Sequence, residues 1–170
     1  WFKGLRDFDF AKAYAGLKKN ALERTMLPWR AGSATSLDKF FYEHGYIPGL
    51  KPGEPETVKE VDQNWEKRQS VSVTLDASYC DWCLAQLAAD QKKSDDERLF
   101  LKRAENYKNV FRTDKGLVWP KDADGNWIEG IDPKLAGREY FTENNAYTYN
   151  WVVKHDLAGL FQLMGGKAQA

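Results

Sequence analysis

The chain has 170 residues, of which 25 are basic and 25 acidic, so its formal net charge is zero. A chain of this length can bury roughly 70% of the surface of its unfolded state in one domain. Because the charges balance and form no basic stripe, the sequence predicts no nucleic-acid partner, and no apolar run approaches the ~20 residues of a membrane span.

A first helix is predicted from about residue 8 to residue 25 by apolar residues that recur at helical spacing. Asp7 or Asp9 can cap its start, because a short acidic side chain can accept an otherwise unpaired N–H of the first turn. Pro28 predicts its end, because proline disfavours helical geometry in the residue before it.

A short second helix begins at Thr35 or Ser36, and Gly45 closes it. Residues 48–69 then contain Pro48, Gly49, Pro52, Gly53 and Pro55, which leave little room for regular structure. We therefore expect a long loop in this range. Long ordered loops are often functional.

The most apolar helix is predicted from about residue 71 to residue 91. Asp76 and Asp81 lie within it, and the sequence leaves open whether each is solvated, salt-bridged or part of a site. Cys80 and Cys83 match a C-x-x-C spacing, but they lie inside a helix and have no second cysteine pair or nearby histidine. We expect them to be buried packing residues rather than a redox or zinc site.

The next segment begins with a predicted capping box at Ser94 to Glu97 and continues as a helix to about residue 111. Residues 112–138 read as irregular structure. The turn at residues 122–126 has spaced acidic side chains, but its glycine is fourth rather than sixth, so a solvated turn is expected rather than an EF-hand calcium loop. Short strand candidates lie at residues 117–119 and 126–128.

The last segment reads as one long amphipathic helix from about Glu143 to Gly166. Thr142 can cap its start, and Gly165 with Gly166 can end it, because glycine tolerates the left-handed conformation that ends helices. The repeated pattern of helix, long loop and helix predicts an all-α fold with long irregular loops, in a single segment that spans residues 1–170.

One face of this helix combines a carboxylate with aromatic and amide groups. A step of 100° per residue places Tyr147, Asn150 and Trp151 on the side of Glu143. In glycoside hydrolysis one carboxylic acid protonates the leaving oxygen and a second carboxylate acts on the other side of the sugar. A structural interpretation stays open beside this one, because an acidic residue in a first turn also stabilises the helix dipole.

Five blocks, read in order, carry a resemblance to a known family. They are residues 8–21, Gly45–Pro48, Val71–Ala88, Arg103–Phe111 with Asp124–Trp127, and Glu143–Trp151 leading to His155 and Asp156. Together they resemble the catalytic domain of glycoside hydrolase family 92, the calcium-dependent exo-acting α-mannosidases. That family combines an N-terminal β-sandwich with an (α/α)6 barrel. The resemblance therefore implies a partial (α/α)6 barrel, or α/α toroid, without the sandwich and the rest of the barrel.

The implied activity is the inverting removal of terminal mannose from glycans, with an α-1,2-type linkage. The family's general acid carries over to Glu143. Asn144, Tyr147 and Thr148 stand where the family has Gly, Trp and Gln, which bears on the linkage that is cleaved. The residues expected to line or support the sugar site are Asn145, Tyr147, Tyr149, Trp151, His155 and Asp156.

The resemblance also predicts what this segment does not supply. The family's catalytic base belongs to a Gly-Asn-Asp segment that does not occur in the 170 residues, so the segment alone is expected to be inactive and to carry only the acid. Calcium is implied as the cofactor, with its ligands outside this chain or not identifiable in it. We expect exposed apolar helix faces that drive self-association or contact with the missing barrel segments, and a periplasmic, cell-surface or secreted location.

Two alternatives compete with this reading. The first is a non-catalytic carbohydrate-binding or interaction module on the same helical scaffold, which would need no acid. The second is another (α/α)6 hydrolase that acts on a different sugar.

Overall fold

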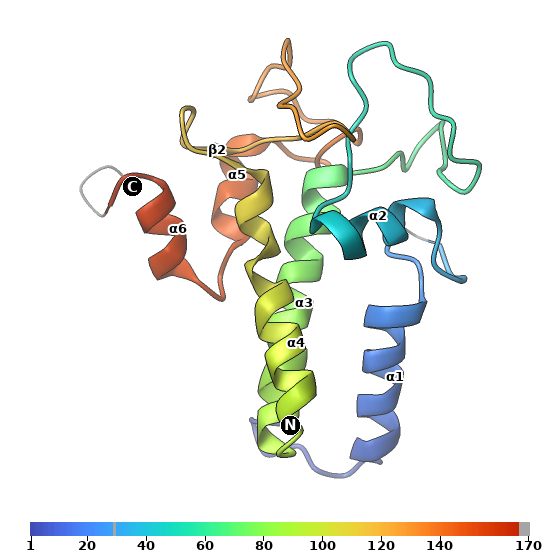
Figure 1. The fold of residues 1–170 in the computed structure, drawn as a ribbon, viewed down its shortest axis with the longest axis vertical. Coiled ribbons are helices and arrows are strands. Elements are labelled where there is room, and N and C mark those ends of the chain that lie inside the picture. Colours follow the sequence, from blue (N-terminus) through green and yellow to red (C-terminus); the bar gives the residue numbers. More distant parts are fainter. Residues whose placement is uncertain (29, 167–170) are drawn as a thin grey trace.

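The computed structural model describes residues 1–28 and 30–166 and shows a mainly helical chain with long loops (Figure 1). Its helices, 3-10 helices (η) and strands are α1 (Phe10–Glu23), α2 (Ser36–His44), α3 (Ser70–Asp90), α4 (Ser94–Ala104), η1 (Glu105–Val110), β1 (Phe111–Arg112), β2 (Leu117–Val118), α5 (Ala146–Tyr149), η2 (Asn150–Val152) and α6 (Leu157–Leu163). The predicted helical character is confirmed. In the described residues the strands form one antiparallel pair, in which Phe111 lies opposite Val118.

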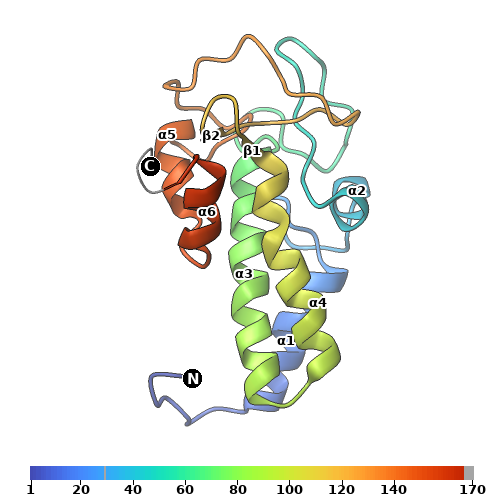
Figure 2. The same cartoon turned by 60° about the vertical axis from the view of Figure 1, so that its left-hand side comes forward.

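The helices α1, α3 and α4 form the lower part of the molecule, with α3 and α4 antiparallel and side by side (Figures 1 and 2). Arg103 on α4 joins all three, because it donates to Asp81 Oδ2 on α3 at 2.8 Å and to the Ala21 carbonyl on α1 at 3.1 Å. Burial raises the pKa of Asp81 to about 6, against the opposing effect of Arg103. The small core between these helices consists of Tyr14, Leu84, Ala85, Ala88 and Phe100.

A larger core lies where the first half of α3 meets η1 and the C-terminal segments. Ala146 of α5 and Leu160 of α6 belong to this core, so residues far apart in sequence pack together here. The buried residues of this larger core are Tyr46, Val71, Leu75, Tyr107, Val110, Phe111, Val118, Phe141, Ala146, Val153 and Leu160.

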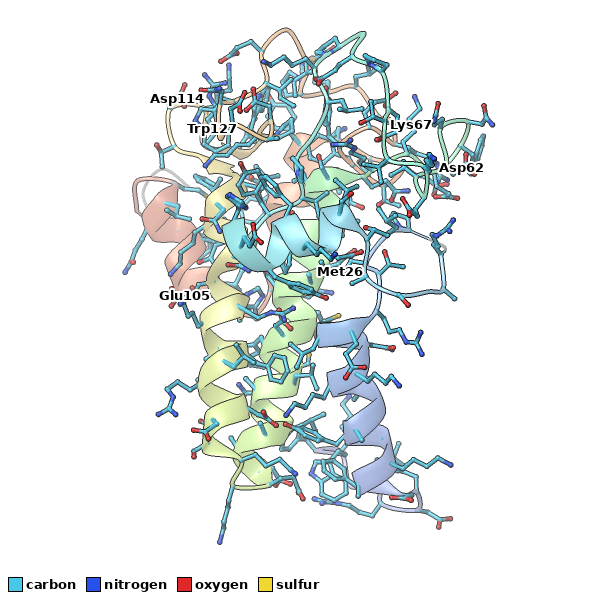
Figure 3. All side chains as sticks on the ribbon, turned by 45° about the vertical axis from the view of Figure 1, so that its right-hand side comes forward. Met26, Asp62, Lys67, Glu105, Asp114 and Trp127 are labelled. Carbon is cyan, nitrogen blue, oxygen red and sulfur yellow. The ribbon has the colours of Figure 1, made fainter. Side chains whose placement is uncertain are left out.

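The long loops gather at the end of the molecule where α3 begins. Figure 3 places Asp62 and Lys67 at this end, away from Glu105. The predicted loop 48–69 is confirmed, and a buried ion pair pins it: Arg68 Nε donates to Glu56 at 2.6 Å, and Arg68 Nη1 donates to the Pro48 carbonyl at 2.9 Å. An ordered loop end of this kind can hold side chains in fixed positions for a ligand.

The prediction of one long helix from Glu143 to Gly166 is wrong. The chain forms the short helices α5 and α6 here, with η2 directly after α5. Asn145 and Asp156 each cap a new α-helix, because their side chains accept the backbone N–H of Thr148 at 3.2 Å and of Gly159 at 2.9 Å. The apolar spacing alone did not separate the two helices. The role of the terminal glycines is confirmed, since Gly165 and Gly166 have φ of 96° and 99° after α6.

Two smaller predictions also fail. The expected capping box at Ser94 is absent, because Lys93 is the capping residue of α4 and makes no side-chain cap bond. Cys80 is exposed and Cys83 is partly buried, so tight packing does not explain the pair, and neither forms a disulfide in the described residues. Among residues 1–28 and 30–166, no helix combines the length and apolarity needed to cross a membrane.

Candidate active site

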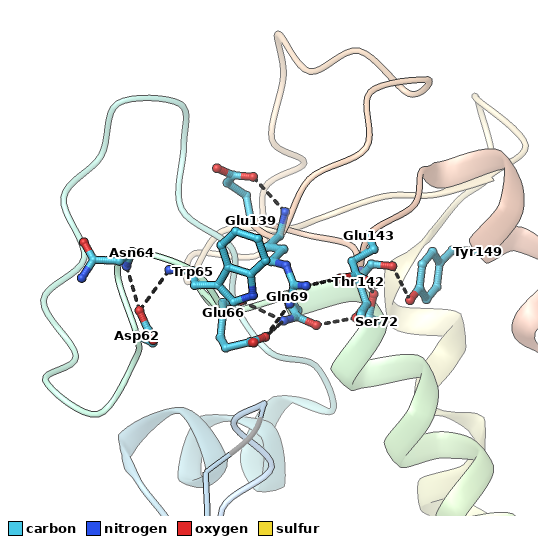
Figure 4. A network of polar contacts seen from close by, with 11 residues as sticks. Asp62, Asn64, Trp65, Glu66, Gln69, Ser72, Glu139, Thr142, Glu143 and Tyr149 are labelled. Atoms are coloured by element: carbon cyan, nitrogen blue, oxygen red, sulfur yellow. Dashed lines mark hydrogen bonds and ion pairs between the residues drawn. The ribbon is translucent and has the colours of Figure 1, made fainter.

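Glu143 lies in a loop just before α5 rather than in the first turn of a helix. Its backbone has φ of +54°, a left-handed conformation that costs a residue with a Cβ about 1–2 kcal/mol. Hydrogen bonds hold the preceding residue: Ser72 Oγ accepts the Thr142 N–H at 2.8 Å, and the Tyr149 hydroxyl donates to the Thr142 carbonyl at 3.2 Å (Figure 4). The carboxylate is thereby presented outward, with 67% of its side chain exposed.

Arg138 is the centre of the contacts around Glu143. Its Nη2 pairs with Glu143, its Nη1 donates to Glu66 Oε2 at 2.6 Å, and its guanidinium lies 4.8 Å from the centroid of the Trp65 ring. Gln69 completes the network by donating to Glu66 Oε2 at 2.9 Å. Two carboxylates, a guanidinium, an amide and an indole from segments about 70 residues apart therefore form one connected cluster (Figure 4).

Strained backbone is concentrated in this cluster and in Lys67, which lies next to it in the sequence. Among the described residues four that are not glycine have positive φ, and three of them are Lys67, Gln69 and Glu143. Lys67 forms an ion pair with Glu139 that lowers the pKa of Glu139 against the raising effect of burial. Strain of this kind persists where the surrounding structure enforces it, and such positions cluster at functional sites.

Two cavities flank the cluster. One, of about 700 Å³, lies between residues 50–68 and 130–141 and includes Lys67 and Glu139 in its wall. The other, of about 940 Å³, is a groove along α1 and α3 that has Gln69 and Thr142 among its lining residues. Both spaces are of ligand size, and Gln69 is the network member that lines one of them, whereas Glu143 and Arg138 line neither.

The structure places two of the predicted site residues, Asn145 and Tyr149, in support of the segment around Glu143. Asn145 caps the helix that follows Glu143, and Tyr149 holds the Thr142 carbonyl while its ring packs 5.5 Å from Phe141. These two residues therefore support the segment that carries Glu143. Tyr147 and Trp151 are 47% and 55% exposed and remain free to contact a ligand.

His155 and Asp156 lie elsewhere. The Asp156 carboxylate accepts the Tyr107 hydroxyl at 2.7 Å, and this bond and the Gly159 N–H lower its pKa although burial opposes the change. His155 Nε2 lies 3.0 Å from the Ala104 carbonyl, in a cluster of aromatic rings with Tyr107. Their hydrogen bonds anchor the C-terminal segment to η1 and α4, and none of these bonds involves Glu143 or Arg138.

No set of three or more His, Cys, Asp or Glu side chains in residues 1–28 and 30–166 could hold a metal ion. Asp122 instead closes its turn, because its Oδ1 accepts the N–H groups of Asp124 at 3.0 Å and Asn126 at 2.9 Å. The residues described here therefore do not form a calcium site built from three or more such side chains.

Replacing Arg138 by methionine is expected to destabilise the folded protein by about 1–3 kcal/mol, because the substitution leaves the 16%-exposed Glu66 and the neighbouring Glu143 without their common cation. Urea denaturation gives the free energy of unfolding. Lys67→Met is the matched control: its ion pair with Glu139 is 39% and 50% exposed and should be worth under about 1 kcal/mol. Equal losses in both variants would contradict a central role for Arg138.

Sequence reasoning did not identify Trp65, Glu66, Gln69 and Arg138 as part of this cluster. The one signal available was the proline- and glycine-rich loop at 48–69, whose length pointed to a functional segment. The pairing of that loop with Arg138 depends on tertiary packing, which spacing along the chain does not report.

Comparison with known proteins agrees with the geometry. The family model described as the glycosyl hydrolase family 92 catalytic domain matches residues 1–170. Searching the curated proteins gives no match.

Solved structures of family GH92 mannosidases also match this chain. The family GH92 inverting mannosidase BT2199 from Bacteroides thetaiotaomicron VPI-5482 is 30% identical with a TM-score of 0.78, over 98% of this chain and 20% of its own. The family GH92 α-mannosidase BT3965 from Bacteroides thetaiotaomicron is 27% identical with a TM-score of 0.72, over 96% of this chain and 18% of its own. The same mannosidase in complex with mannoimidazole is 26% identical with a TM-score of 0.74, over 96% and 19%.

The chain thus spans about a fifth of the length of the solved mannosidases it matches. Its helices, its loops and the cluster around Glu143 all lie within the matched residues, and the family model extends over all 170 positions. The chain belongs to glycosyl hydrolase family 92.

Proposed function

We propose that this chain is the acid-bearing segment of a longer inverting α-mannosidase, with Glu143 as the general acid. The observation that carries the proposal is the outward-facing carboxylate of Glu143. It lies on a strained backbone next to Thr142, which Ser72 anchors, and it pairs with Arg138, within a chain that matches the family 92 domain throughout. Glu143 would give its proton to the oxygen between two sugars as that bond breaks.

The chemistry requires a second carboxylate. In an inverting glycosidase the base lies about 6.5–9.5 Å from the acid, on the other side of the sugar, and activates a water molecule. We assign the base to a part of the longer protein outside these residues, so the isolated segment is inactive. In this structure the Glu143 carboxylate is paired with Arg138. A bound substrate would have to displace Arg138 from the carboxylate before Glu143 could donate a proton.

The groove of about 940 Å³ along α1 and α3 fits the same proposal. Its wall includes Leu17, Val73, Ala77, Leu84 and Leu87, an apolar surface that soluble proteins rarely leave uncovered. We infer that further helices of the longer protein cover it and close an (α/α)6 toroid. In the isolated segment the same groove would drive association between copies.

The remaining features rest on the family resemblance. We propose terminal α-1,2-linked mannose of glycans as the substrate, calcium as the cofactor with its ligands outside residues 1–28 and 30–166, and export to the periplasm or cell surface. Mannose recognition is supported by the mannoimidazole complex of the related mannosidase.

The test is hydrolysis by the full-length protein of α-1,2-mannobiose and of the matching α-1,2-linked glucose disaccharide. We expect mannose release with the β-anomer as first product by proton NMR, little glucose release, and loss of activity on chelation that calcium restores. Release of the α-anomer first would contradict inversion. Binding of mannobiose without any hydrolysis would favour the non-catalytic module instead.

A further inference from the structure

Trp65 is a large aromatic side chain that is 64% exposed and yet held in place. Asp62 Oδ1 accepts the backbone N–H groups of Asn64 at 2.8 Å and Trp65 at 3.0 Å, which fixes the turn from which the ring projects. The Arg138 guanidinium lies 4.8 Å from the ring centroid and covers part of one face. An indole with one supported face and a large exposed surface is a preformed stacking surface.

The position of the Trp65 ring relative to Glu143 indicates which part of a substrate the ring would contact. The guanidinium that supports Trp65 also pairs with Glu143, so one functional group separates the ring from the carboxylate (Figure 4). A general acid protonates the oxygen between the sugar that is cleaved and the leaving group. The leaving group therefore begins directly beside the acid, within reach of an aromatic ring on the same support.

We propose that Trp65 is the stacking platform for the leaving-group sugar, a specificity-determining role that rests on the proposed mannosidase function. A sugar ring presents a face of C–H groups, which suits the negative face of an aromatic ring. Loss of this contact should weaken binding of substrates that carry a second sugar and leave substrates without one unaffected.

The polar groups around the ring favour a neutral sugar over an anionic ligand. Acidic side chains outnumber basic ones there, and carboxylates facing an anion would repel it. They can accept hydrogen bonds from hydroxyl groups instead. The acidic residues are Asp62, Glu66, Glu139 and Glu143, and the basic ones are Lys67 and Arg138.

The experiment compares two substrates in the full-length protein and its Trp65→Ala variant. One is α-1,2-mannobiose, whose leaving group is a sugar. The other is α-mannosyl fluoride, whose leaving group is a fluoride ion that needs neither an aromatic platform nor a proton. We expect Trp65→Ala to raise KM for mannobiose about tenfold with kcat within about twofold, and to leave both constants for the fluoride unchanged. Trp65→Phe should restore most of the loss.

The possible outcomes distinguish failure of the Trp65 platform from failure of the mannosidase assignment on which it rests. If the wild-type protein hydrolyses both substrates and Trp65→Ala changes neither KM, the platform is refuted and the mannosidase assignment stands. A parallel loss on mannobiose and fluoride would also refute it, because the residue would then act on the mannose site or on folding. If the wild-type protein hydrolyses neither substrate, the assignment and the platform both fail.

Discussion

Glu143→Gln in the full-length protein is expected to lower kcat for α-1,2-mannobiose by about 10²- to 10⁴-fold, the usual contribution of a positioned general acid. Glutamine keeps the size of the side chain and can still accept the bond from Arg138, but it has no acidic proton to give. The loss should depend on the leaving group. Hydrolysis of α-mannosyl fluoride, whose departure needs no proton, should fall by less than about tenfold.

Glu129→Gln is the matched control for this experiment. Glu129 is 64% exposed and pairs with Arg112 through a 2.6 Å contact, so its replacement tests whether removal of any surface carboxylate next to an arginine affects turnover. We expect wild-type rates on both substrates. Equal losses on mannobiose and fluoride in Glu143→Gln would show that Glu143 does not act as the acid.

The second large effect is expected from Asp81→Ala, which should destabilise the protein by about 3–5 kcal/mol. The Asp81 side chain is 2% exposed, and its removal leaves the Arg103 guanidinium, 13% exposed, as a buried charge without its partner. Arg103 also donates to the Ala21 carbonyl on α1, so the contact between α1 and the α3–α4 pair should loosen as well.

Chemical denaturation of the wild-type protein and of Asp81→Ala measures the change in the free energy of unfolding, with Asp95→Ala as the control. Asp95 pairs with Arg98, but the two side chains are 90% and 78% exposed, and such pairs contribute about 0–1 kcal/mol. A loss for Asp81→Ala no larger than that of Asp95→Ala would show that the buried pair does not hold the three helices together.

The first two helices, α1 and α2, were predictable from local chemistry. Asp9 caps α1 by accepting the Lys12 N–H at 3.0 Å, and Thr35 precedes α2, whose Asp38 accepts the Thr35 N–H at 2.6 Å. The starts of both helices depend on side chains that pair with backbone N–H groups a few residues away. Where helix periodicity coincides with such caps, the sequence indicates the element and its start.

The C-terminal segment shows where that reasoning fails. A continuous apolar stripe predicted one helix, but Asn145 and Asp156 each start a new helix, and Glu143 is left-handed. Caps inside an apolar stripe compete with helix continuation, and spacing does not decide between them. The error matters for the site, because the shared face of Glu143, Tyr147 and Trp151 was derived from that single helix.

Asn150 shows the consequence most clearly. The 100° rule placed it beside Glu143, whereas it is 3% exposed and its side chain accepts the Val118 N–H at 2.8 Å and donates to the Gly116 carbonyl at 3.0 Å. It holds the turn between β1 and β2 against η2. Glu143 itself was reached through the family resemblance, and its partners Trp65 and Arg138 only through the tertiary structure.

A crystal structure of the full-length protein with mannoimidazole would test the central claim most directly. The imidazole ring of this compound places a nitrogen where the glycosidic oxygen of a mannoside lies. We predict that Glu143 will have left Arg138 and will lie about 3 Å from that nitrogen, with a carboxylate from outside the present chain on the opposite face of the sugar ring. Mannoimidazole bound with Glu143 still paired to Arg138 and a different carboxylate at the nitrogen would contradict it.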